Sequence, residues 1–223
     1  MRDLLGELLF GGACYVCRGP ARGFLCSGCG SELPSLDGAL CPQCALPSPG
    51  GALCGRCLSD PPDYDATIAA LAYDFPADAL VHALKFRGEL SIAPYLARLL
   101  AERIAPGERI DLIVPVPLSA ARLRRRGYNQ AVEIARHLPG KMDHGLCTRE
   151  RDVTPQSELP WAQRQRNVRG AFVCKRPLGG LALAVVDDVM TTGATLNEMA
   201  RTLKRAGAAR VVNWVVVRTL LPA

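Results

Sequence analysis

The sequence predicts an α/β protein in which a parallel sheet is flanked by helices and preceded by a small cysteine-rich module. Two observations lead to this fold class. Eight of the ten cysteines lie within residues 14–57, and the rest of the chain alternates apolar runs with amphipathic segments. The 223 residues, 49% of them hydrophobic, suffice for one ordinary domain plus a small module. Pro61 and Pro62 mark a linker, so the expected domains are residues 1–62 and 63–223.

The cysteines of the first module form four C-x-x-C pairs. Two thiolates three residues apart on a tight turn can reach one metal ion, and two such pairs complete the tetrahedral shell that zinc prefers. We therefore expect two structural Zn²⁺ ions, held by Cys14, Cys17, Cys26, Cys29, Cys41, Cys44, Cys54 and Cys57. The spacing leaves open whether consecutive or interleaved pairs share an ion. Cys147 and Cys174 stand apart and are expected to be inert thiols.

Two other uses of these cysteines are less favoured. A disulfide framework would require an oxidising compartment, whereas we expect no secretion signal and a cytoplasmic protein. A thioredoxin-like redox centre would need one C-x-x-C pair on a βα unit rather than four on turns.

The second domain is predicted to consist of strands that alternate with helices. Continuous apolar runs such as IDLIVPVP suit strands buried on both faces, and Leu196, Met199 and Leu203 form one face of a helix. The expected strands are residues 66–73, 110–117, 171–174, 181–186 and 211–217. The expected helices are residues 76–88, 92–104, 128–138 and 195–207, with a short amphipathic helix at the N-terminus. Residues 147–170 show no period and are expected to form a functional loop.

The net charge of +6 is concentrated in the middle and C-terminal part of the chain, where residues 119–170 hold 11 basic and 5 acidic side chains and residues 175–218 hold 7 and 3. A focused positive region suggests a polyanionic partner such as nucleic acid, phosphate or pyrophosphate. A solvated basic face would have the same composition. No run reaches the roughly 18 apolar residues that a membrane helix needs, so no membrane insertion is expected.

The strongest functional signal is LALAVVDDVMTTGATL, residues 181–196. A buried strand is expected to end at Asp187 and Asp188, and a helix follows the turn made by Thr191, Thr192, Gly193, Ala194 and Thr195. Ligands bind beyond the carboxyl ends of parallel strands, and a helix N-terminus favours a phosphate. The two carboxylates would repel that phosphate, so they should face sugar hydroxyls or Mg²⁺. The pattern predicts a ribose 5-phosphate site.

Two interpretations compete with this prediction. A Walker-B-like strand end would require a G-x-x-x-x-G-K-[ST] loop, which the sequence lacks. A helix cap without a ligand would explain one threonine, but not the aspartates, threonines and glycine as a set.

VVDDVMTTGATL resembles the phosphoribosyl pyrophosphate (PRPP) loop of type I phosphoribosyltransferases. The chain as a whole resembles the ComF (ComFC) competence family. The shared features, in the family's order, are the cysteine module, ALKFRG (83–88), VPVPLSAARLRRRGYNQA (114–131), TPQSEL (154–159), RQRNVRGAF (164–172) and the PRPP loop. The resemblance implies a type I phosphoribosyltransferase-like sheet preceded by a double zinc ribbon.

The resemblance also implies roles for individual residues. Asp187 and Asp188 would hold the ribose hydroxyls of PRPP, which carries Mg²⁺, and residues 191–195 would hold its 5-phosphate. Val116 and Pro117 belong to a segment that looks like the loop binding pyrophosphate through backbone N–H groups. Residues 149–169 resemble the flexible loop that closes on PRPP. The further candidates for the pyrophosphate and flexible loops are Arg126, Asn129, Gln130, Gln156, Arg164, Asn167 and Lys85.

Two functional classes follow from the resemblance. The first is a component of natural transformation that aids the uptake or handling of single-stranded DNA, with a ComFA-type helicase as its partner. The second is a metabolic phosphoribosyltransferase that displaces pyrophosphate from C1 of PRPP. PRPP acting as a regulatory ligand is an intermediate hypothesis. The sequence identifies neither an acceptor pocket nor a catalytic residue.

Overall fold

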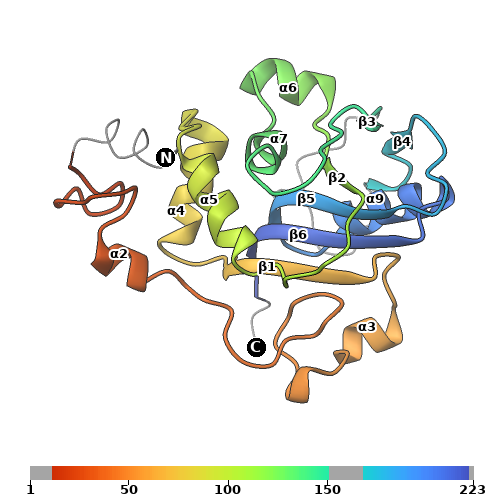
Figure 1. The fold of residues 1–223 in the computed structure, drawn as a ribbon, viewed down its shortest axis with the longest axis horizontal. Helices are drawn as coiled ribbons and strands as arrows, with labels where there is room; N and C mark the ends of the chain where they lie inside the picture. The colour runs from red at the N-terminus through yellow and green to blue at the C-terminus, as the bar shows by residue number, and fades with distance from the viewer. Residues whose placement is uncertain (1–11, 151–167, 221–223) are drawn as a thin grey trace.

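A four-stranded parallel sheet forms the centre of the computed structural model, which describes residues 12–150 and 168–220 (Figure 1). The strands lie in the order β1-β6-β5-β2, and β6 pairs in parallel with both β1 and β5. Every residue of β6 after the first is buried, as its run of valines predicts. The strands are β1 (Ala66–Ala72), β2 (Leu112–Pro115), β5 (Ala182–Met190) and β6 (Arg210–Arg218). The predicted fold class is confirmed.

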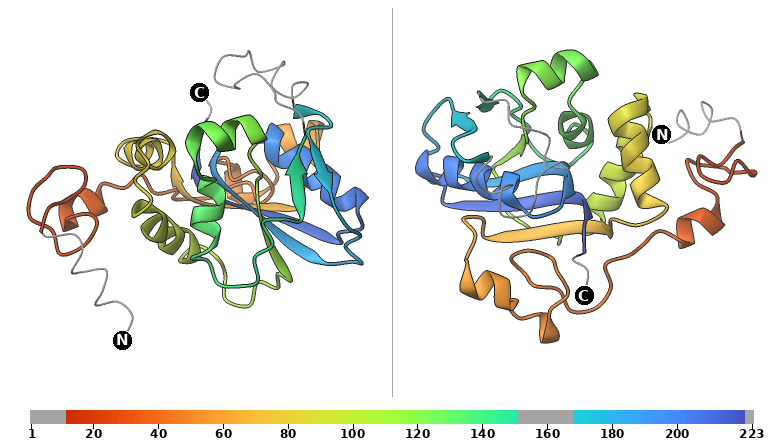
Figure 2. Two further views of the ribbon diagram at one scale, coloured as in Figure 1. Left: turned by 90° about the horizontal axis from the view of Figure 1, so that it is seen from above. Right: turned by 180° about the vertical axis from the view of Figure 1, so that it is seen from behind.

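Helices cover both faces of this sheet (Figure 2). On one face, buried residues of α4 (Ala77–His82), α5 (Ile92–Ala101) and α7 (Gln130–Ala135) form one hydrophobic cluster with Ala184 and Val186 of β5. On the other face, α9 (Ala194–Arg205) packs against Leu183 and Val185. Alternate residues of β5 thus belong to two separate hydrophobic clusters, as the period of a strand requires.

Short elements complete the described part of the chain. A π-helical turn, η2 (Ala83–Arg87), continues α4 and ends at Gly88, whose φ of +71° is left-handed. The others are α2 (Ser27–Ser31), η1 (Pro49–Gly51), α3 (Gly55–Ser59), α6 (Ala120–Arg126) and the antiparallel pair β3 (Cys147–Arg149) and β4 (Phe172–Cys174).

The structure corrects the sequence prediction at three places. Strand β5 does not end before Asp187, but continues to Met190, because its pairing with β6 extends to the partners Met190 and Arg218. Helix α6 was not expected. Neither was β3, which lies at the start of the stretch that shows no sequence period. The expected N-terminal helix falls in residues 1–11, outside the described residues.

The cysteine-rich module packs directly on the second domain. Residues of its second half, including Cys44 and Cys57, belong to the same hydrophobic cluster as the sheet and α9. The segment that joins the two halves of the module covers the edge of β1, where Ala72 N donates to Pro34 O at 2.8 Å. The boundary near residue 62 stays a prediction, and the hydrophobic packing is continuous across it.

Candidate functional site

Two groups of four cysteines lie close together in the N-terminal module, with the sulfurs of each group within 4.8 Å of one another. The first quartet is Cys14, Cys17, Cys26 and Cys29, and the second quartet is Cys41, Cys44, Cys54 and Cys57. Consecutive C-x-x-C pairs therefore share a site. Zn–S bonds of about 2.3 Å in a tetrahedron place sulfurs about 3.8 Å apart. The Cys17–Cys26 and Cys44–Cys54 sulfur distances are 3.7 and 3.6 Å, so both quartets fit structural zinc.

The two aspartates lie near the carboxyl end of β5. Asp188 is 2% exposed, and Lys85 Nζ of η2 lies 3.0 Å from its Oδ2 as an ion pair. The same Oδ2 lacks a hydrogen bond of good geometry among the described residues, so this contact is chiefly electrostatic. Asp187 is partly buried, and its Oδ1 accepts a hydrogen bond from Asp188 N at 3.0 Å. The structure thus assembles two carboxyl groups and one ammonium group.

The environment of Asp187 disfavours its charged form. Burial, followed by the negative charge of Asp188, raises the pKa of Asp187 to about 8, while Lys85 acts in the opposite direction. Asp187 is therefore mostly protonated at pH 7 in the ligand-free protein. A bound divalent cation or a pair of hydroxyl donors would stabilise its ionised form.

Residues 191–193 form a tight turn between β5 and α9, and Ala194 and Thr195 are the first residues of the helix. Gly193 is the residue that caps α9, and its φ of +81° is left-handed. A Cβ at this position would lie 2.9 Å from Met190 Cε and 3.1 Å from the Tyr64 hydroxyl, so only glycine fits without displacement. Ala194 N donates to Thr192 Oγ1 at 3.2 Å. The turn presents the positive end of a 12-residue helix at the carboxyl edge of the sheet, a favourable position for an anion.

The candidates that follow β2 divide into two kinds. Arg126 lies within electrostatic reach of Asp188: burial lowers the pKa of its guanidinium, and the charge of Asp188 opposes this shift. Asn129 instead supports the fold, because its Nδ2 donates to Val116 O at 3.0 Å and its Oδ1 caps α7. Gln130 is 4% exposed, and its Oε1 has no hydrogen-bond partner among the described residues.

The expectation that Val116 and Pro117 offer backbone N–H groups to an anion is wrong. Val116 N donates to Val186 O at 2.9 Å, which extends the pairing of β2 with β5. Pro117 has no N–H group, and neither has Pro115. Backbone donors for an anion in this region would have to come from residues after Pro117.

The sequence prediction misses two arginines that contact the turn. Arg218 ends β6 with 0% exposure, and it donates to Met190 O and Cys44 O, both at 2.9 Å. Arg56 of α3 donates to Thr192 O at 2.9 Å. The available signal for Arg218 is a charged residue that ends the apolar run VVNWVVV. The sequence holds no comparable signal for Arg56.

Comparisons with known proteins place the chain in a family. A family model described as "Double zinc ribbon domain" matches residues 5–58. The chain is 40% identical to "DNA utilization protein YhgH" of Escherichia coli (strain K12), over 94% of this chain and 98% of that protein. It is 32% identical to "Competence protein F" of Haemophilus influenzae, over 92% and 96%. The chain belongs to the ComF family.

Three further known proteins share less sequence identity with this ComF protein. It is 26% identical to "Competence protein ComFC" of Streptococcus pneumoniae, over 87% of each chain. An allosteric regulatory enzyme of purine biosynthesis superposes with a TM-score of 0.37 and 22% identity, over 55% of the ComF protein and 25% of that enzyme. A purine phosphoribosyltransferase from Pyrococcus horikoshii gives a TM-score of 0.32 and 18% identity, over 69% and 87%. The fold class of the ComF protein rests on its own sheet.

Three predicted site residues of the ComF protein, Gln156, Arg164 and Asn167, lie outside the described residues, and their roles stay predictions. Within residues 12–150 and 168–220, no helix combines the length and the apolar character that a bilayer span requires.

Proposed function

We propose that this ComF-family protein binds PRPP with Mg²⁺ at the carboxyl end of β5. The observation that carries the proposal is the acid pair, Asp187 and Asp188, which lies directly before a glycine-capped helix N-terminus. The carboxyl groups suit the ribose hydroxyls, and the turn of residues 191–195 suits the 5-phosphate. Lys85 and Arg126 supply positive charge for the pyrophosphate group.

Bound Mg²⁺ would neutralise charge on the pyrophosphate group. The chain's own residues then bind PRPP and orient it. Asp188 anchors Lys85 close to the ligand, and Asp187 accepts hydrogen bonds once it is ionised. If an acceptor displaces pyrophosphate, the cations Lys85 and Arg126 stabilise the negative charge that develops on the leaving group.

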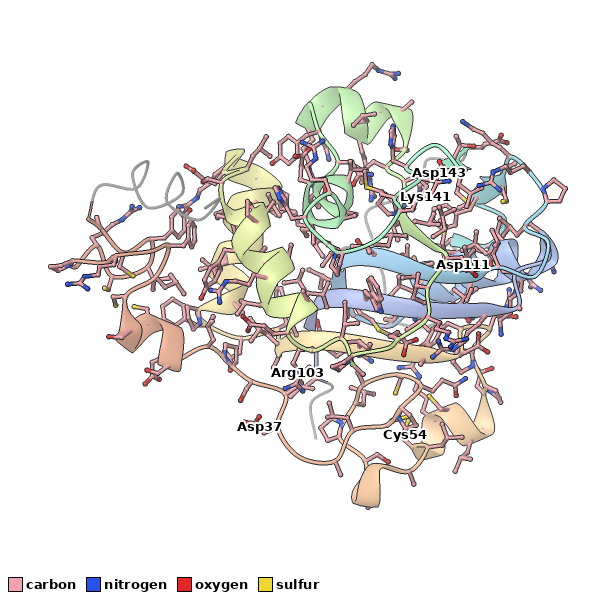
Figure 3. The ribbon with its side chains drawn as sticks, viewed as in Figure 1. Asp37, Cys54, Arg103, Asp111, Lys141 and Asp143 are labelled. Carbon is pink, nitrogen blue, oxygen red and sulfur yellow. The ribbon has the colours of Figure 1, made fainter. Side chains whose placement is uncertain are left out.

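The test is calorimetric titration of PRPP and Mg²⁺ into the zinc-loaded full chain and into Asp188→Ala. We expect saturable binding that the variant loses, while both proteins retain two zinc ions. Asp143→Ala is the matched control, because Asp143 also pairs with a cation, Arg176, at 3.3 Å but outside this site (Figure 3). Unchanged affinity in Asp188→Ala would refute the site.

A second proposal, the handling of single-stranded DNA, is favoured by the surface around α6. None of the seven residues of α6 is buried, and Arg122, Arg124, Arg125 and Arg126 lie on it. Next to this helix, Phe86 is 65% exposed, with Arg126 5.5 Å from its ring centroid. Exposed arginines can follow a phosphate backbone while an aromatic ring stacks on a base. The name "DNA utilization protein" of the YhgH relative agrees with this proposal.

Fluorescence anisotropy with a labelled oligothymidylate tests the DNA proposal. The double variant Arg124→Gln/Arg125→Gln should weaken binding. It should also make the negative slope of log K against log salt shallower by about 1.4, since each phosphate contact on a single strand contributes about 0.7. The control Arg109→Gln/Arg205→Gln removes two exposed arginines elsewhere. Phe86→Ala should weaken binding with little change in slope. Equal binding by both double variants would contradict the proposal.

A phosphoribosyltransferase activity is the alternative proposal. It requires that a base or another acceptor release pyrophosphate from PRPP in an enzyme-coupled assay. A ComFA-type helicase would be the partner in the DNA-handling proposal, and co-purification with the zinc-loaded chain would detect it. Release of pyrophosphate without any effect on DNA binding would favour the metabolic alternative.

A further inference from the structure

Arg218 is a fully buried cation, and no carboxylate pairs with it among the described residues. Burying a guanidinium is costly unless nearby negative charge compensates for it. Its Nε donates to Cys44 O at 2.9 Å, so the guanidinium lies against the second quartet. Four thiolates around one Zn²⁺ carry more negative than positive charge. The metal-loaded second quartet therefore explains why a cation is tolerated here.

The same arginine holds the turn that follows β5. Arg218 Nη1 donates to Met190 O at 2.9 Å and also to Thr191 O. The next carbonyl, Thr192 O, accepts from Arg56 Nη2 at 2.9 Å. Arg56 lies on α3, which begins directly after Cys54 and contains Cys57. Two guanidinium groups next to the second quartet thus donate hydrogen bonds to the carbonyls of three consecutive residues, 190–192.

Fixing these carbonyls also fixes the N–H groups of the same peptide units. In a planar trans peptide, the C=O of one residue and the N–H of the next point in opposite directions. Because the carbonyls of residues 190–192 accept hydrogen bonds from Arg218 and Arg56, the N–H groups of residues 191–193 are directed away from these two guanidinium groups. Successive N–H groups that point the same way form an anion-binding concavity. The Tyr64 hydroxyl lies next to Gly193, 3.1 Å from the position that a Cβ there would take.

We propose that Arg218 and Arg56 are positioning residues that couple zinc at the second quartet to phosphate binding at residues 191–193. The proposal rests on the proposed PRPP function. Neither arginine contacts the ligand; each acts through the backbone of the turn. Coupling between two sites is reciprocal, so zinc strengthens PRPP binding and PRPP strengthens zinc retention by the same factor.

Calorimetry on zinc-loaded full-length variants measures the first half of this coupling. Arg56→Gln should weaken PRPP binding about tenfold, within the usual range for coupled sites. Arg218→Lys keeps the buried charge but loses the planar fork, and it should weaken binding similarly. Arg103→Gln is the matched control, because Arg103 Nη2 donates at 3.1 Å to Leu36 O, a carbonyl remote from the turn (Figure 3). If Arg218→Lys does not fold, Arg56→Gln decides.

Zinc transfer to a chromogenic chelator measures the second half, in a Cys14→Ser/Cys17→Ser background that retains only the second quartet. At equilibrium with the chelator, PRPP should raise the zinc affinity of the second quartet about tenfold there, and by clearly less once Arg56→Gln is added, because only Arg218 then remains to couple the sites. Substitution of a merely structural arginine would change the zinc affinity equally with and without PRPP. PRPP binding that is equal in Arg56→Gln and Arg103→Gln would overturn the coupling and leave the proposed function intact. Absence of PRPP binding by the unmodified chain would overturn both.

Discussion

The carboxyl group of Asp187 makes ligand binding depend on pH. With a pKa raised to about 8, mainly by burial and then by Asp188, it holds a proton that a cationic or hydroxyl-bearing ligand would displace. The charged groups that act on it are Asp188 and Lys85, and Asp188 also interacts electrostatically with Arg126. Binding of Mg²⁺ and PRPP should therefore release up to one proton, and the affinity should rise from pH 7 to about 8 and then level off.

The measurement is the Kd between about pH 7 and 9, with calorimetry in buffers of different protonation enthalpy to count protons. The rise is at most about tenfold per pH unit for one proton. Phosphate groups titrate near pH 6, below this window. Asp187→Asn should bind weakly with no pH dependence. An affinity that stays constant over this range in the unmodified chain would contradict the role of Asp187.

The same pKa shift fixes the sign of its effect on stability. An unfolded Asp187 would titrate near 3.8, whereas the folded one titrates at about 8. Between these values the folded state holds the extra proton, so its stabilising contribution is complete below about pH 4 and is lost as the pH rises to about 8. Asp187→Asn should flatten this part of the ligand-free stability profile in urea titrations.

Gly193 is the position in the turn where a single methyl group should be most damaging. Gly193→Ala places a Cβ in a left-handed residue, 2.9 Å from Met190 Cε. The strain should lower the free energy of unfolding by about 1–3 kcal/mol and weaken PRPP binding. Gly30→Ala is the control, since Gly30 does not have a left-handed φ and a Cβ there would meet nothing within 4 Å. Urea denaturation of both variants would measure the difference, and equal stabilities would rule out strain at Gly193.

At the scale of elements, α6 and α5 differ in how deeply their apolar side chains are buried. Leu123 of α6 is 44% exposed, whereas Leu96 of α5 is fully buried. Leu123→Ala should therefore change the free energy of unfolding by less than about 0.5 kcal/mol. Leu96→Ala should cost about 2–5 kcal/mol, because it leaves a cavity. Chemical denaturation compares the two, and a large loss in Leu123→Ala would mean that α6 is a packing element rather than an exposed binding surface.

The contrast explains which elements a sequence reveals. Helix α9 and strand β6 were predictable to within about two residues, because burial imposes an apolar period on their sequences. Helix α6 buries nothing and so carries no such period. The end of β5 was missed because pairing with β6 keeps two aspartates in a strand despite their low β propensity.

The same physical distinction applies to the site. Asp187, Asp188 and Gly193 lie within one short segment, so a local motif reveals them. Arg56 and Arg218 are distant from the turn in sequence, and only the fold brings their side chains to it. The backbone of Val116 was mispredicted because its N–H partner, Val186, belongs to another strand.

For the whole molecule, the two zinc sites should differ in their effect on stability. The second quartet contributes Cys57 and others to the hydrophobic cluster of the sheet, whereas Cys17 of the first quartet is exposed. Cys57→Ser should therefore lower the Tm of the sheet domain more than Cys17→Ser. Each variant should lose one of two zinc ions. Thermal unfolding followed by circular dichroism, with metal analysis, checks both points; equal Tm losses would show that the second quartet stabilises the sheet domain no more than the first quartet does.

The strand order has a consequence for how the protein is made. β6 follows the other described strands in sequence, yet it lies between β1 and β5 and joins them. While the ribosome is still adding residues before 210, β1 has no partner strand, and the segment that carries the aspartates has β2 alone. An unfinished polypeptide would thus expose two apolar strand edges and lack the guanidinium of Arg218. Assembly of the site must wait for β6, and synthesis that stops before it leaves a product for chaperones and proteases rather than a partly active protein.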